Sequence, residues 1–337
     1  MSHYKHLSIE EREKLYLMRG QGLTLRCIAA ELGRSPSTVS RELRRNKAKS
    51  HAYSPSKAQK YYEKRRTHCG RKHILCSPEK RERIRRLIQV SHWSPEEISN
   101  RLRIEGDPLQ MSYSSIYRAI RSGLFDENKR EADRSRKKCF AYHLRRKGKE
   151  KRGKGERNRQ GQHYLTANRI SDRPVEADIR AELGHFEADT VLGKRSGARL
   201  LSMVDRMSRY TLAAKLPGES PEATRDAMIS LLAQLPQDKV KSITPDCGSE
   251  FSLYRDVSAA ICHVPFYFAD PHSPWQRGTN ENTNGLIREY LPKSTDMTPV
   301  PDHDIAEFIR LLNLRPRKCL NWRSPLEIFF SCSLHLS

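Results

Sequence analysis

The stretch LGHFEADTVLGKRSGARLLSMVDRMSRYTLAAKL, residues 183–216, decides the fold of the second half of the chain. Apolar and polar side chains alternate over residues 185–191, which is the pattern of a strand with one buried face. A second apolar run at 200–204 ends near Asp205, and a third at 210–216 follows a tight turn. We therefore expect three strands joined by short connections.

The residues that follow predict alternating helices and strands. Ser220 and Pro221 are typical of a helix start, because a serine cap and a first-turn proline suit the unpaired amides there. Beyond that helix we expect a buried strand at 240–244, a short helix, a strand at 264–268 and a long helix at 274–290. The order βββαβαβα indicates an α/β domain with a mixed sheet.

Three carboxylates fall at informative places in this pattern. Asp189 lies in the first strand, Asp246 follows the fourth, and Glu281 lies on the long helix with 34 residues between it and Asp246. Ligands bind at the carboxyl ends of strands in open α/β sheets, so acids from these elements can converge on two divalent cations. Oxygen ligands of this kind suit Mg²⁺ or Mn²⁺.

Spacing alone does not decide which acids are ligands. Glu187 and Asp189 point to the same face of the first strand, so either can be the ligand. Asp205 ends a strand and can equally be a turn residue paired with Arg206 or Arg209. Acids at strand ends are also common on protein surfaces, and that alternative stays open for all three.

The chain of 337 residues carries a formal net charge of +23, and the excess lies entirely in its first half. Residues 1–160 hold 42 Lys and Arg against 18 Asp and Glu, whereas the remainder holds 21 against 22. Nucleic acid is the natural partner, because each neutralised phosphate releases condensed counterions. A solvated basic tail or attraction to a membrane surface would give the same composition.

No stretch approaches 18 consecutive apolar residues, and the N-terminus lacks the apolar run of a signal peptide. We therefore expect an intracellular protein without a membrane partner. Its eight cysteines include no CxxC pair, so reduced thiols are expected. His68, Cys69, His73 and Cys76 lie close in sequence, but their spacing fits no common zinc pattern, and metal binding there stays open.

Residues 7–46 predict three short helices that form a helix-turn-helix. The predicted helix starts are Ser8 with Glu11, Thr24, and Ser35 with Pro36. Ala29 lets two helices cross, Gly33 makes the turn and Val39 seals the crossing. The third helix then presents these side chains to DNA: Ser37, Thr38, Ser40, Arg41, Arg44 and Arg45. An ordinary small helical bundle with a basic face is the alternative.

A second, weaker helix-turn-helix signal covers residues 93–121. Ser94 and Pro95, followed by two acids, are typical of a helix start, where the helix dipole favours negative charge. A turn around Gly106 separates this helix from one that Ser112 can cap. The side chains expected to face DNA are Ser114, Ser115, Arg118 and Arg121. Because the turn is long, a plain two-helix hairpin stays as an alternative.

These patterns divide the chain into five segments. Residues 129–160 contain fifteen Lys and Arg with three glycines, which indicates a flexible linker that follows phosphates. The expected segments are a helix-turn-helix domain at 1–50, a basic helical connector at 51–90, a second helix-turn-helix-like unit at 91–125, a basic flexible linker at 126–175 and an α/β domain with a C-terminal helical extension at 176–337.

Together the motifs resemble the insertion-sequence-30 family of transposases over nearly the whole chain. The stretches that carry the resemblance are HLSIEEREKLYLMRGQGLTLRCIAAELGRSPSTVSREL, GHFEADTVLGK, DRMSRYTL, SPWQRGTNENTNGLIREYLPK and NLRPRKCLNWRSPLEIF. The fourth stretch is the most specific. Two features depart from the family pattern: Cys247 stands where similar sequences have Asn or Arg, and the separation of Asp246 from Glu281 is slightly longer.

The resemblance assigns Asp189, Asp246 and Glu281 as the catalytic and metal-binding acids, and so chooses Asp189 over Glu187. It implies an RNase H-like, integrase-type fold and dependence on Mg²⁺. It also implies that the N-terminal region binds the terminal inverted repeats of an insertion sequence. Such enzymes cut DNA at these ends and join them to target DNA.

The long helix and the loop before it carry further candidates for DNA contact. Asn280, Asn284 and Arg288 can line one side of the helix and reach phosphates. Trp275 and Gln276 can stack on or touch a distorted DNA end, although core packing explains Trp275 equally well. A short basic patch is expected downstream, at Arg315, Arg317 and Lys318.

We therefore predict a DDE-type DNA transposase that acts by in-line phosphoryl transfer through two Mg²⁺ or Mn²⁺ ions. Its expected partners are double-stranded DNA, as inverted repeats and as target, and further copies of itself in a synaptic complex. The expected location is the bacterial cytoplasm, at the nucleoid. A DNA-binding regulator with an inactive RNase H-like domain is the rival prediction. A nuclease acting on RNA is a third, which the two DNA-reading units argue against.

Overall fold

The computed structural model describes residues 6–46, 53–66, 69, 74–126, 140–144, 168–193, 197–270, 273–293 and 295–335. By its internal contacts the chain divides into two compact units, Met1–His73 and Ile74–Ser337. Across the described residues, none of the helices has the length and apolar character that crossing a membrane would need.

The described part of the first unit is helical. Its elements are α1 (Ile9–Gly20), α2 (Leu25–Glu31), α3 (Pro36–Asn46) and α4 (Pro55–Arg66). The predicted caps form, since the Ser8 hydroxyl accepts the amide of Glu11 and the Thr24 hydroxyl accepts the amide of Cys27. Gly33 takes φ +61° between α2 and α3, as the turn requires.

The core of the first unit lies where α1, α2 and α3 meet. Its fully buried apolar side chains are Leu15, Ile28, Ala29 and Val39. Ala29 and Val39 therefore pack at the helix crossing, as the sequence predicts. α4 belongs to the same unit, because Gln59 on α4 accepts a hydrogen bond from the buried Arg12 of α1.

The second unit begins with a helical bundle. Its elements are η1 (Ile74–Cys76), α5 (Pro78–Gln89), α6 (Pro95–Ile104), α7 (Tyr113–Arg121) and η2 (Phe140–His143). Ile84 and Ile88 of α5 are buried against Ile98 of α6 and Ile116 of α7. The segment predicted as one connector, 51–90, is thus shared: α4 packs in the first unit and α5 in the second.

A four-stranded sheet forms the centre of the second unit. Its strands are β2 (His185–Leu192), β3 (Arg199–Asp205), β4 (Thr211–Leu216) and β5 (Ser242–Thr244). They lie in the order β4-β3-β2-β5, with β2 antiparallel to β3, β3 antiparallel to β4, and β5 parallel to β2. The predicted mixed α/β sheet is confirmed.

The strand predicted at 264–268 is shorter in the structure. Only β6 (Tyr267–Phe268) is extended, and it pairs in parallel with β1 (Asn168–Arg169). Pro265 has no amide hydrogen to give to a ladder, so regular pairing is interrupted there. A bridge between Ile243 and Phe266 still places this pair beside β5. β1 and η2 both fall inside the segment predicted as a flexible linker.

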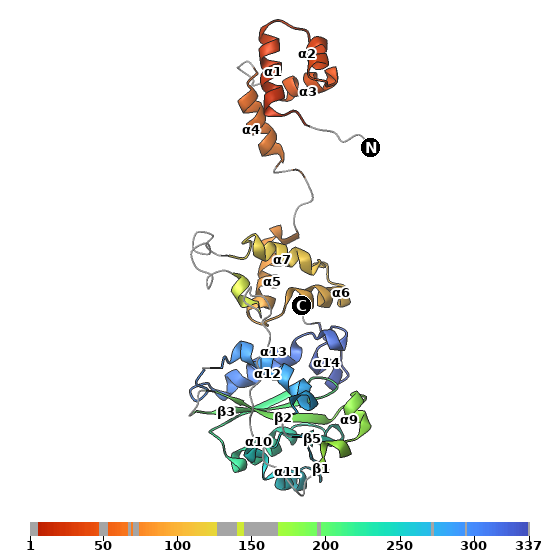
Figure 1. The fold of residues 1–337 in the computed structure, drawn as a ribbon, viewed down its shortest axis with the longest axis vertical. Helices are drawn as coiled ribbons and strands as arrows, with labels where there is room; N and C mark the ends of the chain where they lie inside the picture. The colour runs from red at the N-terminus through yellow and green to blue at the C-terminus, as the bar shows by residue number, and fades with distance from the viewer. Residues whose placement is uncertain are drawn as a thin grey trace. The chain divides into compact units, whose positions relative to one another are not determined.

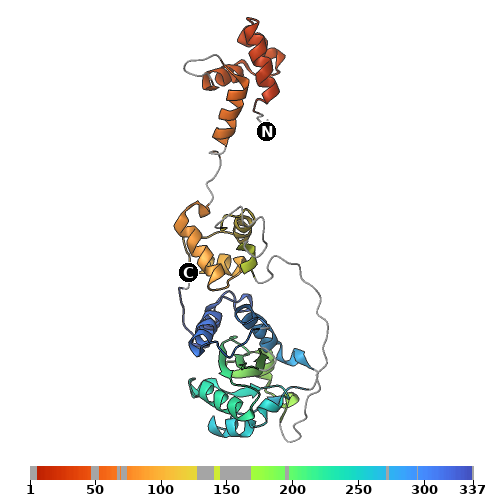
Figure 2. The same ribbon diagram turned by 90° about the vertical axis from the view of Figure 1, so that its left-hand side faces the viewer.

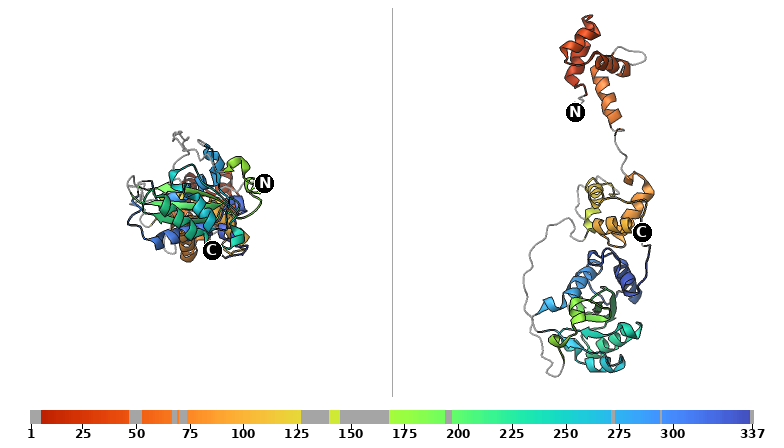
Figure 3. Two further views of the ribbon diagram at one scale, coloured as in Figure 1. Left: turned by 90° about the horizontal axis from the view of Figure 1, so that it is seen from below. Right: turned by 90° about the vertical axis from the view of Figure 1, so that its right-hand side faces the viewer.

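Helices cover both faces of the sheet, as Figures 1 and 2 show and as the right panel of Figure 3 repeats. They are α10 (Pro221–Leu232) and α11 (Tyr254–Ala260) on one face, and α12 (Gly278–Tyr290) and α13 (Asp302–Leu314) on the other. Phe186 and Ala188 pack toward α10, whereas Val191 packs toward Ile287 of α12. Because side chains alternate along β2, Glu187 and Asp189 share the face of Val191.

Two short helices complete the second unit, α9 (Val175–Ile179) and α14 (Pro325–Phe329). A buried ion pair joins α6 of the helical bundle to α14: the Nη1 and Nη2 atoms of Arg101 donate to Glu327 at 2.7 and 2.8 Å. Arg101 also donates to Glu105 at 2.6 Å. Charge pairing, rather than apolar packing, therefore links the bundle to the end of the chain.

The basic patch predicted at residues 315–318 is largely internal. Arg315 is buried and donates to Glu97 of α6 at 3.1 Å and to Glu289 of α12 at 2.8 Å. Burial, and then the charge of Arg315, lower the pKa of Arg317 to about 10. Lys318 alone of the three is well exposed, and it pairs with Glu96. Arg315 neutralises acids within the fold, and Arg317 donates to the backbone carbonyl of Leu312, so neither arginine belongs to an exposed basic patch.

Candidate active site and DNA-binding surfaces

Asp189 lies near the middle of β2 and faces α12. Its Oδ2 atom accepts a hydrogen bond from Nδ2 of Asn284 at 2.7 Å, and its Oδ1 atom accepts the amide of Thr190 at 2.9 Å. The Nη1 atom of Arg277 lies 3.6 Å from the same Oδ1 atom. Asp189 is thus held between the central strand and the start of α12.

Asp246 follows β5 directly, at the carboxyl end of a strand parallel to β2. Its Oδ2 atom accepts from Nη2 of Arg277 at 3.3 Å, and its Oδ1 atom accepts the amide of Gly248 at 3.0 Å. A single guanidinium group therefore contacts both Asp189 and Asp246. Because β2 and β5 are adjacent, both carboxylates reach the guanidinium group of Arg277.

The electrostatic environment of Asp189 is unusual for an aspartate. Burial and the charges of Asp246 and Glu250 raise its pKa, Arg277 and the amide of Thr190 lower it, and the net result is a pKa of about 6. Clustered acids with raised pKa values are typical of functional sites, because folding alone gains nothing from placing like charges together.

Glu281 lies on the exposed side of the first turn of α12. Arg277 precedes it by four residues and Asn284 follows by three, so the three residues share one face of the helix. Because Arg277 and Asn284 both contact Asp189, this face turns toward the carboxylates. Within the part of the chain that the structure describes, however, no three His, Cys, Asp or Glu side chains are grouped tightly enough to hold a metal ion.

Glu187, the other acid on the same face of β2, is fully buried, and both of its carboxylate oxygens accept hydrogen bonds. Its Oε1 atom accepts from Nη1 of Arg206, and its Oε2 atom accepts the backbone amide of Asn280 at 2.8 Å. The carboxylate thereby fixes the start of α12. Glu187 positions the helix that carries Glu281 and leaves Asp189 as the acid with partly exposed oxygens.

Asp205 is a turn residue, one of the two alternatives open from the sequence. Its Oδ2 atom accepts the amide of Ser208 at 2.7 Å, and its Oδ1 atom accepts the amide of Gly184 at 2.8 Å. The expected pairing with Arg206 does not form, because Arg206 turns to Glu187 instead.

Two residues of this cluster are missing from the sequence prediction. Arg277 is one, and Glu250 is the other: its Oε1 atom accepts the hydroxyl of Thr190 at 2.7 Å. Gly248 lies between the acids, since a Cβ atom there would come within 2.8 Å of Oδ1 of Asp246. The spacing D-x-G-x-E after a buried strand, and an arginine one turn before Glu281, are the signals that point to these residues.

The candidates for DNA contact around α12 have different environments. Trp275 in η6 (Pro274–Arg277) is 74% exposed, which rules out core packing. Gln276 exchanges hydrogen bonds of 2.8 Å with Asp270 and so ties its loop together. Asn280 is fully buried and accepts from the hydroxyl of Ser202 at 3.3 Å, because it faces β3. Its position differs from the predicted one at the DNA surface.

Arg288, also a candidate for DNA contact, donates to the backbone carbonyl of Leu192 at 2.6 Å, at the end of β2. Asn284 touches Asp189 and also accepts from Ser202 at 3.0 Å. Both side chains therefore hold α12 against the sheet next to the carboxylates.

Most of the side chains on α3 and α7 that are predicted to face DNA are exposed. On α3 the exposed residues are Ser37, Ser40, Arg41, Arg44 and Arg45, with Thr38 half-buried. On α7 the exposed residues are Ser114, Arg118 and Arg121, with Ser115 half-buried. Ser112 caps α7 by accepting the amide of Ser115 at 3.3 Å.

The cysteine and histidine cluster can be followed only in part. His68 and His73 lie outside the described residues, whereas Cys69 and Cys76 are exposed free thiols. The other described cysteines are also free, in line with the expected reduced state.

Residues 3–46 match the helix-turn-helix domain family. The chain is 34% identical, over 96% of its length, to the transposase InsI of insertion sequence element IS30A from Escherichia coli, of which the match covers 83%. The transposases of IS1086 from Cupriavidus metallidurans and of IS4351 from Bacteroides fragilis are likewise 34% identical over 96% of this chain, covering 94% and 95% of theirs.

A helix-turn-helix unit followed by an α/β domain with paired carboxylates, together with these relatives, defines a DNA-binding, DNA-modifying enzyme. The chain belongs to the insertion-sequence-30 family of transposases.

Proposed function

We propose that this transposase binds the terminal inverted repeats of its insertion sequence, cleaves DNA at these ends and transfers them to target DNA. The observation that carries the proposal is the contact of Asp189 and Asp246 with one guanidinium group beside Glu281. A carboxylate within one strand and a carboxylate beyond the end of the adjacent parallel strand, both in contact with the same guanidinium group, are arranged as a DDE-type site needs.

The strand order supports an RNase H-like catalytic domain. Three antiparallel strands followed by a parallel fourth, with helices on both faces, place Asp189 on the central strand and Asp246 at the end of its neighbour. Glu281 lies on α12, which packs against β2 and β3. In this arrangement the three acids come from three elements, so the site exists only in the folded chain.

The donor chemistry of the three acids suits hard divalent cations, although the three side chains are not tightly grouped in this conformation. Asp189, Asp246 and Glu281 would hold Mg²⁺ or Mn²⁺, because carboxylate oxygens are the preferred ligands and Arg277 already marks a place for positive charge between two of them. Metal bound there supplies activation of the attacking hydroxyl and stabilisation of the leaving oxygen. Asn284 orients Asp189, and Glu187 holds α12 in position.

The side chains proposed to contact DNA come from three surfaces. On α3 and α7 they are the exposed polar and basic residues described above, and beside the carboxylates they are Trp275 and Arg277. Trp275 is suited to stacking on an unpaired base because it is exposed next to the acids. Synapsis of two ends would require a homo-oligomer, assembled on DNA at the bacterial nucleoid.

A cleavage assay tests this proposal. The full chain, given Mg²⁺ and duplex DNA carrying the inverted repeats that flank its gene, should nick that DNA at the element ends and leave a scrambled duplex intact. Binding without nicking would instead support a DNA-binding regulator, and cutting of RNA–DNA hybrids without end specificity would support a nuclease.

A further inference from the structure

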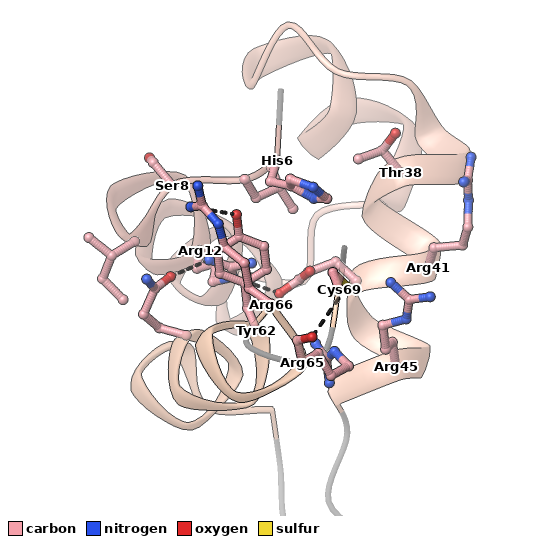
Figure 4. A pocket seen from close by; sticks show the side chains of 14 residues that line it. His6, Ser8, Arg12, Thr38, Arg41, Arg45, Tyr62, Arg65, Arg66 and Cys69 are labelled. Atoms are coloured by element: carbon pink, nitrogen blue, oxygen red, sulfur yellow. Dashed lines mark hydrogen bonds and ion pairs between the residues drawn. The ribbon is translucent and has the colours of Figure 1, made fainter. Parts of the chain in front are cut away.

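A cavity of about 980 Å³ lies in the first unit, between α3 on one side and α1 with α4 on the other. Figure 4 shows the side chains that border it from α3 and from α4: Thr38, Arg41, Arg45, Tyr62, Arg65 and Arg66. The helix-turn-helix family match ends at residue 46, so α4 lies outside it. The sequence analysis gives α4 no role beyond that of a connector.

Glu42 is the one acid among the residues that line the cavity, and it is already neutralised. Its Oε1 atom accepts from Nε of Arg12 at 2.8 Å and from the hydroxyl of Tyr53 at 3.2 Å. Arg12 is 1% exposed and its guanidinium lies 5.1 Å from the ring centre of Tyr62. The Arg12–Glu42 pair is therefore a structural element of the wall.

Four other arginines at the cavity have no acidic partner among the described residues. Arg65 donates to Oδ1 of Asn46 at 2.7 Å and Arg66 donates to the hydroxyl of Tyr62 at 3.4 Å, so both meet neutral groups. Arg41 donates to the carbonyl and hydroxyl of Ser37, and Arg45 forms no ion pair within the described chain. The guanidinium groups from α3 and α4 therefore line the cavity, and no carboxylate among the described residues neutralises them.

The cavity adjoins the face of α3 that is expected to enter a DNA groove. Ser37, Arg41 and Arg44 follow one another at helical spacing along the centre of that face. Thr38 and Arg45 lie along its flank and line the cavity. In a helix-turn-helix complex the strand that borders the groove passes beside the recognition helix, and neighbouring helices contact its phosphates.

We propose that this cavity is a phosphate-binding cleft for the DNA backbone, in which Arg65 and Arg66 of α4 contact a strand flanking the groove read by α3. The inference rests on the proposed docking of α3 in that groove. A phosphodiester fits the site because guanidinium groups bind phosphate oxygens in paired, planar geometry. α4 then extends the DNA-binding unit beyond the matched domain.

Salt dependence of DNA binding tests the cleft. Full-length wild-type protein, an R65Q/R66Q variant and a K57Q/K60Q variant are titrated with two duplexes, one carrying the inverted repeat that flanks the gene and one scrambled. Lys57 and Lys60 are exposed on the same α4 and do not line the cavity, so the control loses the same charge elsewhere.

R65Q/R66Q should weaken binding to both duplexes and reduce the slope of log K against log salt by about 2, because each lost phosphate contact removes about 0.9. K57Q/K60Q should leave the slope near the wild-type value. An unchanged slope in R65Q/R66Q, or an equal reduction in both variants, would overturn the proposal.

Arg65 also bonds Asn46, so thermal unfolding followed by circular dichroism checks that R65Q/R66Q is folded. If it is not, R66Q alone should reduce the slope by about 1; a wild-type slope in folded R66Q overturns the proposal. Equal binding of the wild type to both duplexes would contradict recognition of the inverted repeats. The comparison of the variants would still test whether the cleft binds the phosphates of the DNA backbone.

Discussion

Asp189 lies close to two other acids, and this placement costs stability in the metal-free protein. Burial, together with the charges of Asp246 and Glu250, outweighs the effect of Arg277 and raises its pKa to about 6. At neutral pH the folded chain therefore holds an ionised group in an environment that disfavours charge. The proposed cation site would account for this loss of stability.

Replacing Asp189 by Asn should abolish strand cleavage while raising the unfolding free energy of the metal-free protein by roughly 1–2 kcal/mol, because a disfavoured charge is removed. Urea unfolding and a nicking assay measure the two effects, and binding of end DNA should persist. Asp238→Asn, on the exposed surface, is the control and should change neither. Wild-type cleavage by the Asp189→Asn protein would refute the assignment.

Arg277 competes with any cation that Asp189 and Asp246 would share. Arg277→Gln should therefore tighten Mn²⁺ binding about threefold to tenfold, on the scale of a partly exposed ion pair. Electron paramagnetic resonance of free Mn²⁺ measures the affinity. Lys293→Gln, on the exposed surface just beyond the end of α12, is the control and should leave the affinity unchanged. Equal affinities in all three proteins would contradict this role.

At the scale of elements, one buried carboxylate fixes the start of α12. Glu187 pairs with Arg206 and accepts the amide of Asn280, so the strand and the helix start are linked at a single side chain. Removing the charge leaves the buried Arg206 with only a more distant carboxylate, that of Asp178 at 3.9 Å.

Glu187→Gln should lower the unfolding free energy by about 3–5 kcal/mol, the range for breaking a buried ion pair. Chemical unfolding measures the loss. Asp189→Asn, which changes the next acid on the same face of β2, should instead raise the unfolding free energy. If both substitutions had the same effect on stability, the division into a positioning acid and a cluster acid would be wrong.

Regular elements with clear patterns could be predicted from the sequence, and short ones could not. β2, β3, β4 and α10 follow from alternation, caps and apolar spacing within each element. β1 is two residues long and exists because β6 lies beside it, a pairing that has no local signal. Pro265 is a local signal for the shorter β6, but the strand prediction at 264–268 does not take it into account. Pairing across distant elements is the general limit of such prediction.

The same limit applies to the site. The sequence predicts Asp189 within a strand, Asp246 after a strand and Glu281 on a helix as candidate ligands. The family resemblance then favours Asp189 over Glu187. Arg277 and Glu250 contact the other residues of the site only because β2, β5 and α12 pack together in the folded chain. Asn280 was expected at the DNA surface, but α12 is rotated so that this residue faces Ser202.

On the scale of the second unit, charge pairs join its helical bundle to the end of the chain. The Arg101–Glu327 pair is buried, and Arg315 binds Glu97 and Glu289 nearby. Burial alone would raise the pKa of Glu327, but Arg101 and the amides of Ser324 and Leu334 hold it at about 2.

Because the pKa of Glu327 lies below its ordinary value of 4.5, the stabilisation is complete above that pH and is lost as pH falls toward 2. At pH 7, Glu327→Gln should cost about 3 kcal/mol, and its difference from wild type should shrink between pH 5 and pH 2. Unfolding in urea across this range measures it, with Glu176→Gln on the surface as control. A constant difference would contradict the linkage.

The central claim is that Asp189, Asp246 and Glu281 hold metal together. Fe²⁺ bound in place of Mg²⁺, with ascorbate and peroxide, cuts the polypeptide near its ligands, and the fragments can be mapped by mass spectrometry. We expect cuts around residues 189, 246 and 281 that excess Mg²⁺ suppresses and that the Asp189→Asn variant lacks. Cuts confined to other parts of the chain, or absent around residue 281, would contradict it.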